Sequence, residues 1–545
     1  MFRMSRLVVK SVMLMLTLSC SFLLRAVEDS RQEPAEAKRA AVLLAEGTAA
    51  LERGDSAEAK NLFRRALAID PKNLAARTYL GILADGAGEL AEAERQFAAA
   101  VAAIPSSPEA HNNYGAILLK LGRERQAAAE FEASLRLNPQ QPGALVNLAQ
   151  IRFARGTVEG LRAARELFER ARALAPDAET ARALVVVALR LHEPARATAD
   201  YSVYSAGLGA APASVTAPAA RAELGAALLE TGLFKEAAQE LDAAVYADPS
   251  NVNDILLLAR AYQGQKDLRA AGRVLESAVA RKVEAAPVYA MLAEVYEANG
   301  HIENGIPAMH RAIQLNPKSE AYRFRYAMLL TDNKAPQAAV IRLQEALVEF
   351  PNSSKLWLAM GLAQFEDNKN EEAVKAFSHS VELDPELSPA FAYLGMISVD
   401  QGKIKDAVGY YQKALAADEH SAVLHYLISE ALGKLTPPDN GSAEEHLKRA
   451  LTLDSGFQHA HLALGKFYLR TNRLQDAAEE LEGVVRADPK LAEAYYQLGR
   501  VYMRLKRKED AQAAVAKFEQ LSNAEKQHSE NERREIQRRL ADVRF

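Results

Sequence analysis

The chain contains almost no cysteine. Cys20 is the only one among 545 residues, and it lies in the first apolar stretch. Residues 21–545 therefore form no disulfide among themselves, and cysteine metal sites and thiol catalysis are excluded for them. Charge of one sign is also scarce, because the formal net charge is only −4 and no long acidic or basic block occurs. This balance argues against a nucleic-acid-binding protein.

Local catalytic motifs are missing as well. The sequence has no H-E-x-x-H zinc motif, no G-x-x-x-x-G-K-[ST] phosphate loop, no G-x-S-x-G nucleophile turn and no C-x-x-C-H haem motif. We therefore expect a non-enzymatic protein without a cofactor or a metal ion.

Long apolar runs are confined to the N-terminal end. The run Val12–Leu24 follows Arg3, Arg6 and Lys10, and Leu24-Arg25-Ala26 offers a cleavage site. Residues 1–26 therefore resemble a secretory signal peptide, or alternatively an N-terminal anchor. The stretch Thr17–Cys20 also resembles a bacterial lipoprotein box, in which Cys20 would be lipidated and would hold the chain on a membrane. We expect an exported protein, periplasmic or associated with the cell envelope.

Most of the chain consists of a repeated unit of 34 residues, and the stretch 354–387 shows it most clearly. Counted from Ser354 as position 1, the unit has these markers: Trp357 at 4, Gly361 at 8, Ala373 at 20, Phe377 at 24 and Pro385 at 32. The small residue at position 8 lets a second helix approach the first. Asn368 stands where a turn needs left-handed backbone, and the proline ends the second helix.

This pattern resembles the tetratricopeptide repeat (TPR) family. The resemblance implies an all-α fold, a right-handed α-solenoid (superhelix) of about 13–14 helix-turn-helix repeats that stack because one hairpin cannot bury its own apolar face. The predicted segments are residues 1–26 (signal peptide or anchor), 27–39 (linker), 40–177 (repeats 1–4), 178–217 (degenerate repeat or hinge), 218–522 (repeats 6–14) and 523–545 (a polar helix that covers the open end).

The resemblance also implies where a partner would bind. In TPR arrays the concave wall is lined by positions 2, 5, 9 and 12 of each first helix, and a protein or peptide segment inserts there. In this chain those positions predict a groove that includes Asn112, Phe324, Met328, Leu358, Leu362, Phe365, Met396, Val399, Lys466, Tyr496 and Arg500. Its middle part is apolar. Neither nucleic acid nor a small-molecule cofactor is expected as a ligand.

Two functions are consistent with these features. The first is a non-enzymatic scaffold that binds a partner segment in the groove, in a bacterial cell envelope or outside the cell. The alternative is a periplasmic TPR component of polysaccharide or protein secretion machinery. Five histidines fall close together, namely His420, His425, His446, His459 and His461. A metal site needs three or four converging ligands, so we expect these side chains to pack or to lie at the surface.

Overall fold

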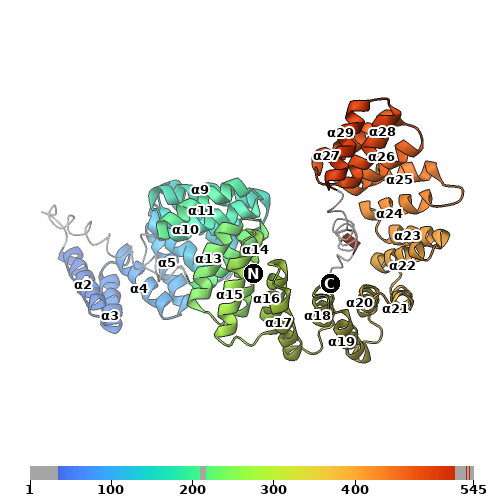
Figure 1. Cartoon of the computed structure of the whole chain (residues 1–545). Coiled ribbons are helices and arrows are strands. Elements are labelled where there is room, and N and C mark those ends of the chain that lie inside the picture. Colours follow the sequence, from blue (N-terminus) through green and yellow to red (C-terminus); the bar gives the residue numbers. More distant parts are fainter. Residues whose placement is uncertain (1–34, 209–216, 522–535, 537–538, 541–545) are drawn as a thin grey trace. The chain divides into compact units, whose positions relative to one another are not determined.

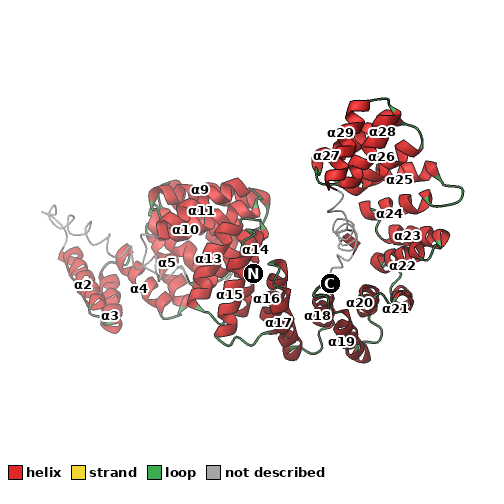
Figure 2. Cartoon of the chain, viewed as in Figure 1, coloured by secondary structure: helices red, strands yellow, loops and turns green. Residues whose placement is uncertain are grey.

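A computed structural model describes residues 35–208, 217–521, 536 and 539–540 (Figure 1). Throughout these ranges the regular structure is helical, and no strand occurs in them (Figure 2). The predicted all-α solenoid of helical hairpins is confirmed. The chain divides into two compact units, one ending at Asp267 and the other beginning at Leu268. Within the ranges that the structure describes, no helix is both long and apolar enough to cross a membrane.

The first unit contains the helices α2 to α14. Their bounds are α2 Ala35–Glu52, α3 Ser56–Ile69, α4 Leu74–Gly86, α5 Leu90–Ala103, α6 Pro108–Lys120, α7 Glu124–Leu137, α8 Pro142–Ala154, α9 Val158–Leu174, α10 Ala178–Arg190, α11 Pro194–Leu208, α12 Pro218–Glu230, α13 Phe234–Ala247 and α14 Val252–Gly264. Each even-numbered helix from α2 to α12 packs against the helix that follows it, as a hairpin.

The second unit contains the helices α15 to α29. Their bounds are α15 Leu268–Ala280, α16 Ala286–Ala298, α17 Ile302–Leu315, α18 Glu320–Asp332, α19 Pro336–Glu349, α20 Ser354–Glu366, α21 Asn370–Leu383, α22 Ser388–Asp400, α23 Ile404–Ala417, α24 Ala422–Gly433, α25 Asn440–Leu453, α26 Gln458–Arg470, α27 Leu474–Ala487, α28 Ala492–Arg504 and α29 Lys508–Leu521. From α16 onward, each hairpin also packs its second helix against the first helix of the next hairpin.

Many hairpins close on a contact between a glycine at position 8 and a large side chain at position 24. A Cβ atom added to Gly361 in α20 would lie 2.5 Å from Cδ1 of Phe377 in α21, which is closer than real Cβ contacts. Gly47, Gly115 and Gly395 face an aromatic ring in the same way. The ring therefore fills the place that any larger side chain on the first helix would need, and the two helices are held at close range.

The turn between the helices uses left-handed backbone. Asn368 has φ of 58°, and Gly88 has φ of 75° at the same place of an earlier repeat. Glycine and asparagine adopt this conformation at low cost, so the turn needs only two or three residues. The second helix α21 then ends at Leu383, immediately before Asp384 and Pro385. The turn and the stop were both expected from the sequence.

Neighbouring hairpins are linked through position 4 of the first helix. Trp357 Nε1 donates a hydrogen bond of 2.9 Å to the carbonyl oxygen of Pro351, at the end of the preceding repeat. His111 lies 3.0 Å from the carbonyl oxygen of Pro105, and Arg323 donates to that of Pro317 in the same way. Because that carbonyl lies just beyond the last turn of a helix, a side-chain donor satisfies it without water.

The segment 178–208 forms the regular helices α10 and α11, although the sequence suggested a degenerate repeat or hinge over 178–217. Residues 209–216 of that prediction lie outside the described residues. Tyr201 of α11 donates a hydrogen bond of 2.9 Å to Oε1 of Glu240 in α13, and Tyr204 lies 3.4 Å from its Oε2. All three side chains are buried. These contacts hold α11 against the next hairpin, and the boundary between the compact units falls later, after Asp267.

Glycine-to-alanine substitutions test the contact between position 8 and position 24. Gly361→Ala should lower the free energy of unfolding by about 1–3 kcal/mol, because the added methyl group overlaps Phe377. Gly409 in α23 has nothing within 4 Å of its added Cβ, so Gly409→Ala should raise stability by about 0.5–1 kcal/mol. Hydrogen exchange of the two full-length variants gives both values, and equal effects at the two sites would contradict the packing account.

Candidate partner-binding surface

The apolar middle of the predicted groove is not open in the structure. Phe324, Leu358, Leu362 and Phe365 are 3%, 0%, 5% and 4% exposed. All four belong to the hydrophobic core of the second unit. This part of the sequence-based prediction therefore needs correction, since these side chains are packed core residues and offer almost no exposed area to a partner.

Packing between successive first helices explains this burial. The ring of Phe365 in α20 meets the ring of Tyr393 in α22 edge-on, with 5.5 Å between the ring centroids. Met328, Met396 and Val399 are half-buried and pack against the same core. Large apolar side chains at these positions fill the space between neighbouring hairpins, and removing them from water is favourable. The sequence position alone does not distinguish this case from an open groove.

The polar members of the predicted groove are engaged between repeats. Asn147 Nδ2 of α8 donates a hydrogen bond of 3.4 Å to Oδ1 of Asn112 in α6. Lys466 Nζ of α26 lies 2.8 Å from Oε1 of Glu493 in α28. Both contacts join consecutive first helices, so these side chains help to fix the stacking of hairpins.

The last predicted groove residues, on α28, do face solvent. Tyr496 is 46% exposed. Met503, at position 12 of the same repeat, is 63% exposed. Arg500 lies between them in the sequence, and its guanidinium carbon is 5.8 Å from the centroid of the Tyr496 ring. The spacing of four and three residues puts the three side chains on one face of α28. We call these three residues the α28 strip.

An aromatic patch lies on the first helices α24 and α26. It consists of Tyr426, Phe457 and His459, whose ring centroids are 5.5 to 6.3 Å apart. Phe457 precedes α26 directly and is fully buried. Arg539, near the C-terminal end of the chain, places its guanidinium carbon 4.7 Å from the centroid of the Phe457 ring.

The clustered histidines separate into different pairs. Nδ1 of His425 in α24 and Nδ1 of His446 in α25 are 2.8 Å apart. His461 Nδ1 lies 2.7 Å from Oε2 of Glu480, and its Nε2 lies 3.1 Å from the carbonyl oxygen of Ser455. Among the residues that the structure describes, no three His, Cys, Asp or Glu side chains are placed to hold a metal ion together.

The pKa values of these histidines shift in opposite directions. Burial lowers the pKa of His425 to about 4, and the neighbouring His446 and Arg449 add to this effect. Burial also lowers the pKa of His446, against the opposing influence of Glu445 and Asp439. The hydrogen bond to Glu480 raises the pKa of His461. The pair of His425 and His446 is therefore neutral in the folded chain near pH 7.

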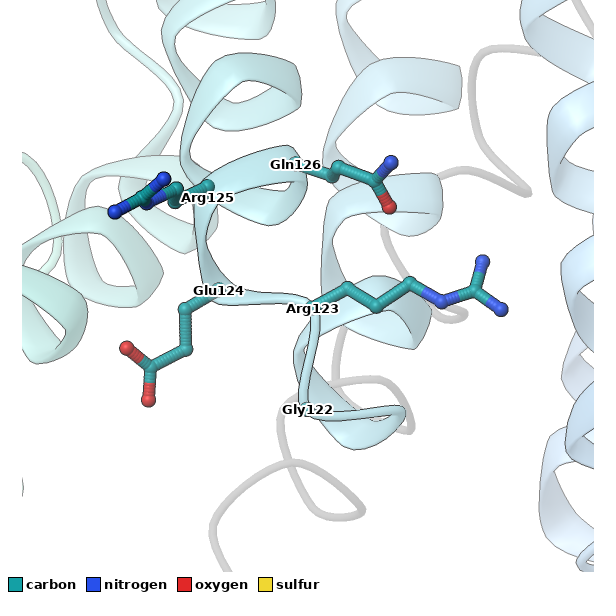
Figure 3. Close-up of a pocket in the computed structure, with 5 residues that line it drawn as sticks. All are labelled: Gly122, Arg123, Glu124, Arg125 and Gln126. Carbon is teal, nitrogen blue, oxygen red and sulfur yellow. The ribbon is translucent and has the colours of Figure 1, made fainter.

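A shallow depression lies at the turn between α6 and α7. It has a volume of about 470 Å³ and is lined by Gly122, Arg123, Glu124, Arg125 and Gln126. Figure 3 shows the side chains of Arg123, Glu124, Arg125 and Gln126 pointing in different directions, with none of them converging on a common point. Arg123 is engaged by Glu94 at 2.6 Å. The depression therefore lacks the convergent polar groups of a ligand site.

Comparison with known families supports the repeat assignment. Two sequence models described as "Tetratricopeptide repeat" match residues 50–117 and residues 115–160 and 462–525. A third, described as "Cilia and flagella-associated protein 70 C-terminal domain", matches residues 279–484. These matches coincide with hairpins of both units.

Curated proteins match parts of the chain. Anaphase-promoting complex subunit 3 of Schizosaccharomyces pombe is 23% identical over 185 residues, which are 33% of this chain and 27% of that protein. The Homo sapiens protein O-mannosyl-transferase TMTC3 is 27% identical over 208 residues, covering 36% and 22%. The Drosophila melanogaster homolog of the BBSome complex member BBS4 is 23% identical over 259 residues, covering 46% and 52%. The chain thus spans from about a fifth to about half of the length of these relatives.

Solved structures match the chain at low identity and low TM-score. The APC/C hetero-tetramer Cut9–Hcn1 has 15% identity and a TM-score of 0.38 over 85% of this chain and 97% of that one. Yeast Tom70 has 17% identity and a TM-score of 0.38 over 83% and 92%.

The buried histidine pair predicts a dependence of stability on pH. Because the folded-state pKa values of His425 and His446 are lowered, the unfolded chain binds protons that the folded chain does not. Stability of α24 and α25 should therefore fall, on the order of 1–3 kcal/mol, as the pH drops from about 6.5 toward 4. In the variant His425→Leu/His446→Leu this loss should shrink.

Urea unfolding followed by hydrogen exchange measures the stability of α24 and α25 at pH 7 and pH 5, in the wild-type chain and in the double variant. His461→Gln is the control, with an effect of opposite sign on the pH dependence of stability. The raised pKa of His461 stabilises the folded chain at low pH, and this contribution is lost as the pH rises. If the double variant lost as much stability at low pH as the wild-type chain, the histidine pair would not be the cause of the loss.

Proposed function

We propose that this chain, as a tetratricopeptide repeat protein, is a non-enzymatic scaffold. It binds a segment of a partner protein on its second unit. The TPR fold is typical of protein–protein interaction. Support for a binding role rather than a catalytic one comes from the assignment of nearly all described residues to packed hairpins.

The exposed α28 strip carries the proposal. Tyr496, Arg500 and Met503 occupy positions 5, 9 and 12 of their repeat, which are the positions that bind ligands in this family. Exposed aromatic, arginine and methionine side chains are enriched where proteins bind each other. The strip offers an apolar surface with one positive charge, which suits a partner segment that carries an apolar side chain beside a carboxylate.

We also propose that the chain is exported. Support comes from the sequence of residues 1–26, which lie outside the described part of the structure, and in particular from the basic residues before the run Val12–Leu24. This placement would make the partner a protein of the cell envelope or of the extracellular space. Lipidation at Cys20 remains the alternative that would keep the scaffold on a membrane.

Site-specific photocrosslinking in cells tests the strip. A photoreactive amino acid in place of Tyr496 should give a discrete crosslinked protein, while the same replacement at Tyr246, which is 88% exposed on the first unit, should not. With the partner identified, Met503→Ala and Arg500→Ala should each weaken its binding about 10-fold or more without loss of stability. Equal crosslinking at both tyrosines, or binding that the two alanine variants leave unchanged, would contradict the assignment.

The mature N-terminus tests export. Mass spectrometry of the chain purified from fractionated cells should find a start near Val27, or a lipidated start at Cys20, in an envelope or extracellular fraction. An intact Met1 in the cytoplasmic fraction would refute this proposal while leaving the scaffold role intact.

A further inference from the structure

Arg539, near the C-terminal end of the chain, contacts the turn between α25 and α26. Arg539 Nη1 lies 2.9 Å from Oδ2 of Asp454, and the two residues are 85 positions apart in the sequence. Asp454 caps the end of α25 and stands three residues before Phe457. The hydrogen bond from Arg539 holds the pKa of Asp454 below its usual value. Arg539 thus meets a carboxylate and an aromatic ring at the same turn.

The neighbours of Arg539 add apolar contacts. Ile536 and Leu540 are 8% and 6% exposed and belong to the large core cluster of the second unit, which includes Phe457 as well as residues of α28 and α29. All three described residues are helical, and a spacing of three and four residues places them on one helix face. Arg539 therefore shares one helix face with the two buried apolar side chains, and all three face the array.

The described contact of Arg539 lies at the turn between α25 and α26, two hairpins before the last one. The sequence suggested that the polar segment 523–545 covers the open end of the solenoid, and that expectation stays a prediction. Most of the segment lies outside the described residues.

The receiving surface is of the kind that binds partners in TPR arrays. Arg539 stacks on Phe457, which forms the aromatic patch with Tyr426 and His459, and these two stand at positions 5 and 2 of their repeats. The contact combines a charge-assisted hydrogen bond, a cation–π contact and burial of two apolar side chains. Peptide recognition by a helix in a groove likewise buries an apolar helix face.

We propose that Ile536, Arg539 and Leu540 form an intramolecular ligand of the surface formed by Asp454 and the aromatic patch, and that this self-contact blocks the surface to external segments. The surface accepts a helical segment with two apolar residues four positions apart and an arginine directly before the second. This inference extends the proposed scaffold function, because the self-contact regulates access to a second binding surface that is distinct from the α28 strip.

A competition experiment on the full-length chain tests the proposal. The probe is a fluorescein-labelled peptide with the sequence of residues 528–545, and its anisotropy reports binding. The wild-type chain should bind it at least 10-fold more weakly than the variant Ile536→Asp/Leu540→Asp, whose own segment is released. Equal affinity of the two chains, or no binding to the released variant, would overturn the proposal.

Charge reversal identifies the binding surface. In the released variant, a further Asp454→Arg substitution should weaken peptide binding at least 10-fold, and a peptide carrying Arg539→Asp should restore it. Asp488 is the matched control, because it caps the end of α27 as Asp454 caps the end of α25. Each aspartate also accepts a hydrogen bond from the backbone N–H two residues later, at Lys490 and at Gly456. Asp488→Arg should leave the affinity unchanged, and an equal loss at both aspartates would show non-specific attraction.

Hydrogen exchange separates release from unfolding. The released variant should exchange faster than wild type at residues 454–461, while α20 to α23 keep their protection. Loss of protection throughout the unit would show that the two aspartates unfold it, and unchanged exchange at 454–461 would overturn the self-contact. If photocrosslinking at Tyr496 finds no partner, the scaffold proposal fails but these results still decide the self-contact, because the probe is the chain's own segment.

Discussion

The contact between a glycine on the first helix and a large side chain on the second is the constraint on which many of the hairpins depend. At Gly361 and Phe377 there is no room for even one additional carbon atom. A close approach of this kind fixes the distance between the two helices and leaves their outer faces to pack against the next hairpin. Since each hairpin buries only part of its apolar surface alone, stacking and the stability of single hairpins are inseparable.

The regular parts of this architecture could be predicted from the sequence because they depend on local contacts. The helix α20 begins at Ser354, where the repeat was expected to begin, and Asn368 has the left-handed backbone that its place in the turn requires. Both features follow from residues a few positions apart. The link from Trp357 to the carbonyl oxygen of Pro351 also spans only six positions, although the sequence indicated packing there and not a hydrogen bond.

The surface could be predicted less well, because exposure depends on what else fills the space. Leu358 and Tyr496 occupy the same position of their repeats, yet the first is fully buried and the second is 46% exposed. The difference comes from the neighbouring hairpins. The contact between Arg539 and Asp454 joins residues 85 positions apart and has no periodic signal, so no repeat pattern could reveal it. The second unit thus has a strip open to partners on α28 and a patch covered by the chain itself.

Double electron–electron resonance on the full-length chain tests this account most directly. With Cys20 replaced by alanine, the chain has no other cysteine, and spin labels can be attached to cysteines placed at Ser455 and Ala541. The account predicts one short, narrow distance that persists when labelled chains are diluted with unlabelled ones. A broad distribution of long distances, or a short distance that vanishes on dilution, would contradict an intramolecular ligand.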